Sequence, residues 1–296
     1  MLLMSPPIGE HLQVGDENED DRDMLVRKAA IMEVKTFSIK SFPEWSDREA
    51  EEAGRFVDSH SLRVGELAPF HIGRHLGSPD SALHQEALDA FRGQLRIAKI
   101  VGAQCIGFGW GKEFRAPDRA IWAEETWRQR IAGVADLARE AEEYGVDVAG
   151  HPLYFSPLCS IERYKEMLDA VASPRLKVLI DIVNLTKPHM VFNTTDFVNE
   201  VFDELGEHIV SLHAKDVKIA GAGLGPCPKV EKGLSLIHLD EVPPGEGVMD
   251  YATILRRLDQ LDQDVTIHVE HFQYEDTIAA QQYIRSVARE VGVSLN

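Results

Sequence analysis

The chain has 296 residues, of which 44% are hydrophobic and 27% are charged, as is usual for a soluble globular protein. Its formal net charge of -18 argues against nucleic acid as a partner, because binding a polyanion requires a basic surface. The same charge disfavours adsorption to an anionic membrane.

The sequence has no apolar run of roughly 18 residues and no basic n-region over residues 1–10, so neither a membrane span nor a secretory signal is expected. Three dispersed cysteines fit a reducing compartment, and we expect a cytoplasmic protein.

Eight short apolar segments predict β-strands along the chain. Most are rich in β-branched residues, and the later ones are nearly continuous in apolar character, as in parallel strands that are buried on both faces. The first segment is the weakest, since Glu10 and His11 interrupt it. In chain order the predicted strands cover residues 8–14, 35–40, 62–70, 103–109, 146–151, 176–182, 208–214 and 265–270.

Helical spacing of apolar residues appears between these strands, most clearly over residues 84–98. Ser46 and Glu49 form a capping box that predicts the start of another helix. The acidic residues 16–23 suit the first turn of a helix, where carboxylates face the positive end of the helix dipole; a flexible acidic segment over residues 1–23 is the alternative. The remaining helices are predicted over residues 127–141, 160–171, 197–205, 250–261 and 276–287.

The alternation of strand and helix persists for about eight rounds, which predicts an α/β protein with a (β/α)8 TIM barrel. An open doubly wound sheet is disfavoured because no GxGxxG or GxxxxGK[ST] phosphate loop follows a strand. We therefore expect a single domain over residues 1–296. The irregular residues 219–247 are expected to form a loop region on the catalytic face of the barrel.

Polar side chains stand where the last four predicted strands end. They are His151, Asp181, His213 and Glu270, and barrel closure would bring these strand ends around one axis. Singly, each residue is more commonly a structural group, but jointly they predict one divalent metal ion. Mixed nitrogen and oxygen ligands suit Mn²⁺, our first choice, as well as Zn²⁺, Co²⁺ or Fe²⁺, and Mg²⁺ less well.

Three residues at or just past earlier strand ends are candidate sugar contacts. Lys40 and Glu66 could hydrogen-bond to hydroxyl groups, and Trp110 could pack on a sugar face. For each residue alone, a salt bridge at the rim or packing in the core is the commoner role.

Further candidates lie close to the predicted ligands in sequence. Asn184 follows Asp181 by three residues and could either reach the substrate or cap the loop. Lys215 is expected beside the metal, where its charge could stabilise an oxyanion or pair with Asp216, itself a candidate substrate contact.

Two other pairs are expected to be structural. His268 and His271 flank Glu270 and are expected to point away from it, by alternation along the strand. Gly245 and Gly247, in the segment PPGEG, are expected to permit a tight turn before the next helix.

The segments IDIVNL, SLHAKD, HVEHF and VPPGEGVMDY resemble the sugar isomerase/epimerase family of xylose-isomerase-like barrels, from about residue 87 onward. In that family Glu, Asp, His and Glu on strands five to eight hold a divalent metal. The resemblance matches Asp181, His213 and Glu270 to the last three ligands. His151 stands where the family has its first glutamate, and this is a departure from the pattern.

The resemblance also implies a chemistry, namely removal of a proton next to a carbonyl with a metal-stabilised enolate. The HxKD motif of the family matches Lys215 and Asp216 along with the histidine. The family uses its two glutamates as an acid/base pair, so His151 is here either the fourth ligand or a free general base, with Glu270 as its partner.

Three functions remain open. The first is an isomerase or epimerase that acts on a small carbohydrate, without phosphate because no phosphate loop is present. The second is a metal-dependent lyase, since the His-Pro of strand five and the DxVNL motif also resemble the α subunits of bacterial C-glycoside deglycosidases, which pair with a small β subunit. The third is a sugar-binding barrel without catalysis, favoured by the missing glutamate. A homo-oligomer is compatible with all three.

Overall fold

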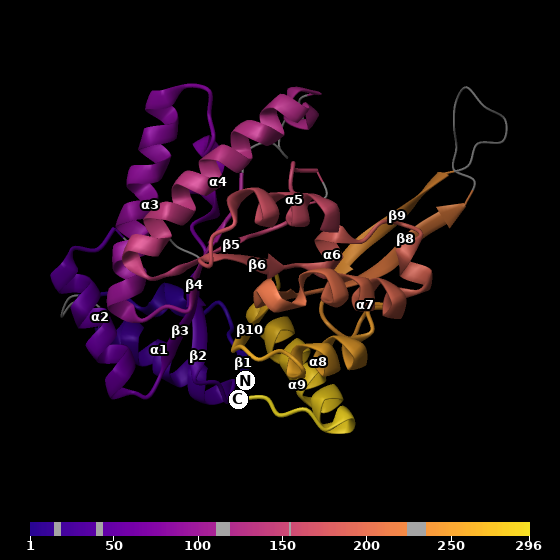
Figure 1. Ribbon diagram of the computed structural model, residues 1–296. Helices are drawn as coiled ribbons and strands as arrows, with labels where there is room; N and C mark the ends of the chain where they lie inside the picture. Colours follow the sequence, from indigo (N-terminus) through magenta and orange to yellow (C-terminus); the bar gives the residue numbers. More distant parts are fainter. Residues whose placement is uncertain (15–18, 40–43, 111–118, 154, 224–234) are drawn as a thin grey trace.

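The structure is a computed structural model that describes residues 1–14, 19–39, 44–110, 119–153, 155–223 and 235–296 (Figure 1). An eight-stranded sheet forms its centre, and every strand pairing that it contains is parallel. The strands are β1 (Leu2–Met4), β2 (Thr36–Ile39), β3 (Arg63–Leu67), β4 (Cys105–Phe108), β5 (Asp147–Gly150), β6 (Leu176–Ile180), β7 (Ile209–Ala214) and β10 (Val265–Val269).

The sheet curls into a nearly closed barrel. Its spatial order is β1-β10-β7-β6-β5-β4-β3-β2, so β1 and β2 are the two ends of the sheet. At the seam between them, Ser38 donates its backbone N–H to the carbonyl of Pro6 at 2.9 Å. The hydroxyl groups of Ser5 and Ser38 lie 2.8 Å apart in the same place. The predicted single (β/α)8 barrel is confirmed.

Helices surround the barrel and cover the outer faces of its strands (Figure 1). The capping box at the start of α2 is confirmed, since Glu49 accepts the backbone N–H of Ser46 at 2.8 Å and donates its own to the Ser46 hydroxyl. No helix among the described residues is both long and apolar enough to cross a membrane. The helices are α1 (Glu19–Ile31), α2 (Asp47–Ser59), α3 (Ser81–Val101), α4 (Glu124–Tyr144), α5 (Ile161–Val171), α6 (Ile182–Leu185), α7 (Thr194–Leu205), α8 (Tyr251–Asp259) and α9 (Tyr274–Val291).

Burial on both faces explains why the later strands are continuous apolar runs. All six residues of β7 are buried, and so are all five residues of β10. One face of each strand packs against the helices and the other fills the barrel. Polar residues on these strands therefore have to find partners inside the barrel or at its mouth.

The predicted first strand over residues 8–14 is wrong. The first strand is β1, three residues at the start of the chain, which pair with β10. Residues Gly9–His11 form a 3-10 turn, and a side chain at Gly9 would lie 2.6 Å from the Ser38 carbonyl oxygen. This turn packs closely against β2 in place of the predicted strand.

The segment after β7 is more regular than the predicted loop. Strands β8 (Asp216–Gly223) and β9 (Ser235–Val242) pair antiparallel and form a two-stranded ribbon. The ribbon extends away from the body of the barrel (Figure 1). It begins directly after the last residues of β7, so its base lies at the carboxyl end of the barrel, where ligands bind in this fold.

Candidate metal centre

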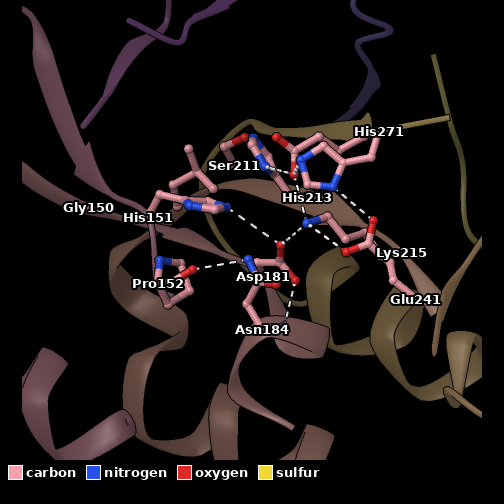
Figure 2. Close-up of polar contacts among 12 residues, drawn as sticks. Gly150, His151, Pro152, Asp181, Asn184, Ser211, His213, Lys215, Glu241 and His271 are labelled. Carbon is pink, nitrogen blue, oxygen red and sulfur yellow. Dashed lines mark hydrogen bonds and ion pairs between the residues drawn. The ribbon is translucent and has the colours of Figure 1, made fainter. Parts of the chain in front are cut away.

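Four side chains, those of His151, Asp181, His213 and Glu270, meet at the mouth of the barrel from the ends of four neighbouring strands. Figure 2 labels the first three. All four are buried, and the potential ligand atoms lie within 4.8 Å of one another. Nε2 of His151 lies 3.5 Å from Oδ2 of Asp181, and Nδ1 of His213 lies 3.2 Å from Oε2 of Glu270. The structure thus brings together the four residues whose clustering the sequence predicted.

Local structure aims the carboxylate of Asp181 at the cluster. Asp181 follows β6 and caps the short helix α6, with Oδ1 accepting the backbone N–H of Asn184 at 3.0 Å. Its other oxygen, Oδ2, is left to face His151 (Figure 2). Asn184 in turn donates its side-chain amide to the carbonyl of Pro152 at 3.0 Å, which ties the loop after β5 to α6.

His213 is held from the opposite side by a buried carboxylate inside the barrel. Glu66 on β3 lies 3.2 Å from Nε2 of His213 and accepts the hydroxyl of Ser211 at 2.8 Å. With Nε2 directed at Glu66, the other ring nitrogen of His213 faces the cluster. Ring nitrogens of metal-binding histidines are commonly oriented in this way by a carboxylate. Glu66 therefore contacts the centre through His213.

Lys215 contributes a cation to the centre. Its side chain is fully buried, and Nζ lies 2.9 Å from Asp181 Oδ2 and 2.8 Å from Glu270 Oε2. A third carboxylate, that of Glu241 on β9, lies 3.4 Å from the same nitrogen. Lys215 thus lies beside the cluster, as expected, but its charge partners are Asp181, Glu270 and Glu241 and do not include Asp216.

The proximity of these charges shifts their pKa values. Burial alone would lower the pKa of His213, but the carboxylates of Glu270 and Glu66 outweigh it and raise that pKa to about 10. Burial opposes ionisation of Asp181, yet the Lys215 ammonium and His151 lower its pKa to about 2. The pKa of Glu270 is also held well below its usual value despite burial, by His213 and Lys215.

The pKa of His151 shifts in the opposite direction to that of His213. Burial is the largest influence and lowers its pKa, against the opposing effect of Asp181. Its imidazole is therefore neutral at pH 7 and has a lone pair available for a metal ion or a proton.

The donor set fits a divalent ion of the transition series. Nε2 of His151, Nδ1 of His213 and Oδ2 of Asp181 are buried and, among the described residues, have charged neighbours but no hydrogen-bond partner. Tetrahedral ligand atoms at bonds of about 2.1 Å lie about 3.4 Å apart, close to the separations of 3.5 Å and 3.2 Å seen here. Two imidazoles with two carboxylates suit Zn²⁺, Mn²⁺, Co²⁺ or Fe²⁺.

Two further predicted substrate contacts were Lys40 and Trp110. Lys40 lies outside the described residues. Trp110 is 1% exposed and packs edge-to-face against Phe108 and Trp127, with ring centroids 6.0 and 6.2 Å away. The structure thus places its ring in the packed core of the barrel wall.

Asp216 supports the base of the ribbon. Its carboxylate accepts three backbone N–H groups, from Val217 at 2.8 Å, Met249 at 2.9 Å and Gly245 at 3.0 Å. These bonds fasten the turn after β9 onto β8. The predicted tight turn is present, with a φ of 97° at Gly245 that favours glycine.

Gly247 lies against the same carboxylate, and we expect Gly247→Ala to destabilise the protein by about 1–3 kcal/mol. The added Cβ would lie 2.2 Å from Asp216 Oδ1 and 2.4 Å from the carbonyl oxygen of Val217. Gly93→Ala in α3 is the matched control, because nothing lies within 4 Å of its Cβ position. In a helix this control should stabilise by about 0.5–1 kcal/mol. Denaturant unfolding of both variants measures the difference, and equal stabilities would contradict the tight contact.

Sequence reasoning missed the roles of two histidines near Glu270. His268 was expected to point away from Glu270, but it is two residues from Glu270 and so shares its face of the strand. Its ring stacks on that of His213 at 4.8 Å inside the barrel. His271 has a φ of 71°, and this left-handed backbone turns Nε2 back to 3.4 Å from Glu270 Oε2.

Glu241 was also missed because it lies in the segment predicted as an irregular loop. Its carboxylate contacts Nδ1 of His271 at 2.8 Å as well as Lys215 (Figure 2). Pairing of β9 with β8 puts Glu241 opposite Val217, next to the end of β7. Only this register could have identified the residue, and the sequence alone did not predict it.

Barrel and cluster together define a TIM barrel with a buried group of potential metal ligands at its carboxyl end. The chain belongs to the xylose isomerase-like TIM barrel family, whose model matches residues 26–289. No curated protein sequence matches the chain.

Solved structures with the same fold include D-psicose 3-epimerase from Clostridium cellulolyticum H10, with a TM-score of 0.66 at 14% identity over 95% of this chain and 96% of that one. The probable 3-DHS dehydratase AsbF from Bacillus anthracis has a TM-score of 0.67 at 14% identity, over 97% and 99% of the chains. The IOLI protein with a bound zinc atom has a TM-score of 0.65 at 15% identity, over 98% of each.

Proposed function

We propose that the protein is a divalent-metal-dependent isomerase or epimerase of a keto sugar, which removes a proton from the carbon next to a carbonyl. The observation that carries the proposal is the convergence of His151, Asp181, His213 and Glu270 within 4.8 Å. Sugar epimerases among the structural neighbours, such as D-psicose 3-epimerase, support the choice of substrate class. Mn²⁺ is our first choice of metal, and Zn²⁺ is supported by the zinc of the IOLI protein.

A divalent ion held by these residues would polarise the substrate carbonyl and lower the barrier to removing the neighbouring proton. Glu270 is the residue best suited to accept that proton. It is ionised at neutral pH because its pKa is held low by His213 and Lys215, and its side chain is 5% exposed at the mouth of the barrel. Lys215 brings a positive charge near the place where negative charge develops on the substrate.

The role of His151 follows from the difference between imidazole and carboxylate. A glutamate can bind a metal with one oxygen and take a proton with the other. An imidazole that binds through Nε2 has only Nδ1 left, on the far side of the ring. We propose that His151 is a ligand through Nε2, the atom that faces Asp181, and that Glu270 is the principal acid/base group.

A metal-dependent lyase is the second candidate, and His151 is the observation that favours it. Epimerisation needs a proton donor on the face opposite the base, whereas elimination of a β-substituent can proceed with one carboxylate. The dehydratase among the structural neighbours fits this alternative. In the C-glycoside deglycosidase form of this proposal, a small partner subunit would complete the enzyme.

Metal analysis tests the proposed centre. We expect about one divalent ion per purified chain, and little bound metal in Asp181→Ala or Glu270→Ala. Activity in both variants should fall at least about 10³-fold, because the lost charge stabilisation is worth several kcal/mol. Glu275→Ala, an exposed carboxylate on α9, is the control and should keep metal and activity.

Deuterium exchange separates the reaction classes. In D₂O the wild type should incorporate deuterium next to the carbonyl of unphosphorylated keto sugars, and an isomerase or epimerase should release no fragment. Release of an aglycone from 3-keto glycosides would favour the lyase. A protein that retains full metal after loss of Asp181 or Glu270 would contradict the ligand assignment.

A further inference from the structure

Lys215 and the metal ion of the proposed function compete for the same atoms. The ammonium forms ion pairs with Asp181 Oδ2 and Glu270 Oε2, at 2.9 and 2.8 Å. These two oxygens are also the ones that face the imidazole nitrogens of His151 and His213. An ion that both oxygens bind would take nearly the position of the ammonium, and two cations so close repel each other strongly at low dielectric.

Glu241 offers the ammonium a second place. Its Oε2 lies 3.4 Å from Nζ of Lys215, and its side chain is 31% exposed, unlike the buried carboxylates of the cluster. His271 holds the other oxygen of Glu241 through Nδ1 at 2.8 Å, so that the carboxylate already faces the lysine. The four-carbon stem of lysine is flexible, and rotation about it can shift the ammonium from one carboxylate to another.

We propose that Lys215 is the resident cation of the metal-free centre and that Glu241 receives its ammonium when a divalent ion enters. This inference rests on the proposed metal centre and adds a positioning role for two residues outside the ligand set. Because Glu241 belongs to β9, metal entry strengthens a contact between the ribbon and the barrel. The ribbon base is thereby fixed in place at the same step that completes the centre.

The two residues have opposite expected effects on metal affinity. Lys215→Met removes the competitor, so we expect Mn²⁺ to bind at least about tenfold more tightly than to the wild type. Glu241→Gln removes the receiving charge, and binding should weaken by about three- to tenfold. Isothermal titration of the metal-free proteins with Mn²⁺ alone measures both, without a substrate.

Matched controls separate competition from a general change of charge. Lys218→Met removes an exposed lysine from β8, the strand that follows Lys215, and Glu246→Gln removes an exposed carboxylate from the turn after β9. Both should change the Mn²⁺ affinity less than twofold. In addition, metal-free Lys215→Met should melt at a lower temperature than the wild type, since Asp181 and Glu270 lose their cation, and Mn²⁺ should raise its Tm by more.

Unchanged or weaker Mn²⁺ binding by Lys215→Met would overturn the competition, and equal affinities of Glu241→Gln and Glu246→Gln would overturn the role of the ribbon. If Lys215→Met does not fold without metal, the inference is tested by the comparison of Glu241→Gln with Glu246→Gln alone. Failure of both the wild type and Lys215→Met to bind Mn²⁺, Zn²⁺ or Co²⁺ would instead overturn the proposed function together with this inference. Metal binding by the wild type with no difference among the variants would overturn the inference only.

Discussion

Replacing His151 by alanine is expected to weaken metal binding by about 100-fold or more and to reduce activity in proportion at limiting metal. The reason is that Nε2 of His151 faces the cluster, 3.5 Å from Asp181, and burial keeps the imidazole neutral. A neutral imidazole is a good ligand for transition metals. The loss of one ligand of four leaves three, which is the protein ligand number of many catalytic zinc sites.

Activity measured with an excess of metal shows whether His151 is a metal ligand or a general base. If His151 is a ligand, saturating Mn²⁺ should restore the kcat of His151→Ala to within about tenfold of the wild type, because the base Glu270 is intact. His151→Glu restores the carboxylate of the family pattern, so this variant should bind Mn²⁺ without an excess of the metal in solution. His189→Ala, an exposed histidine outside the cluster, is the control and should behave as the wild type. Full metal content in His151→Ala with kcat reduced by about 10³-fold would make His151 the base.

Much of the barrel could be predicted because its strands and helices differ so clearly in pattern. A strand such as β7 is buried on both faces and is therefore a continuous apolar run, which few other structures share. Helices α3 and α4 both end at glycines, Gly102 and Gly145, with φ near 70°, and a glycine after a helical pattern is a common signal of a helix end. Strand β1 was missed because three residues are too few to show a period.

The four potential ligands could be predicted for a geometric reason. Each follows or ends a parallel strand, and closure of the barrel brings strand ends together without any knowledge of side-chain packing. The contacts of Lys215 could not be predicted in this way. Whether its ammonium pairs with Asp216 next to it or with Asp181 and Glu270 depends on the backbone N–H groups that already occupy Asp216.

The roles of residues that reach the centre from the side also escaped prediction. Glu66 was expected to bind a sugar hydroxyl, but it lies within β3 and contacts His213, from which it is separated by 147 positions, through the interior of the barrel. Glu241 depends on the pairing of β8 with β9, in a segment rich in glycine that gives no clear strand pattern. His271 depends on a left-handed backbone conformation that non-glycine residues seldom adopt.

Metal affinity is expected to rise about 100-fold between pH 7 and pH 9. In the metal-free protein the carboxylates of Glu270 and Glu66 raise the pKa of His213 to about 10, so its imidazole is protonated at neutral pH. A metal ion needs the lone pair of Nδ1 and must displace that proton. Below the raised pKa, each unit of pH therefore changes the apparent affinity about tenfold.

The stability of the metal-free protein should change in the opposite direction. A raised folded-state pKa of His213 contributes stability that is fully present below the unfolded value of about 6.5 and is lost as pH rises through about 10. The metal-free Tm should thus fall from pH 7 to pH 9 while the increase in Tm caused by Mn²⁺ grows. Melting curves at several pH values, with and without Mn²⁺, measure both trends in one experiment.

His84→Gln is the appropriate control for this pH dependence. His84 is a partly buried histidine that contacts Asp136 at 2.9 Å, away from the centre, and burial lowers its pKa. Its removal should leave the dependence of metal affinity on pH unchanged. An affinity that stays flat from pH 7 to pH 9 in the wild type would mean that His213 is already neutral without metal.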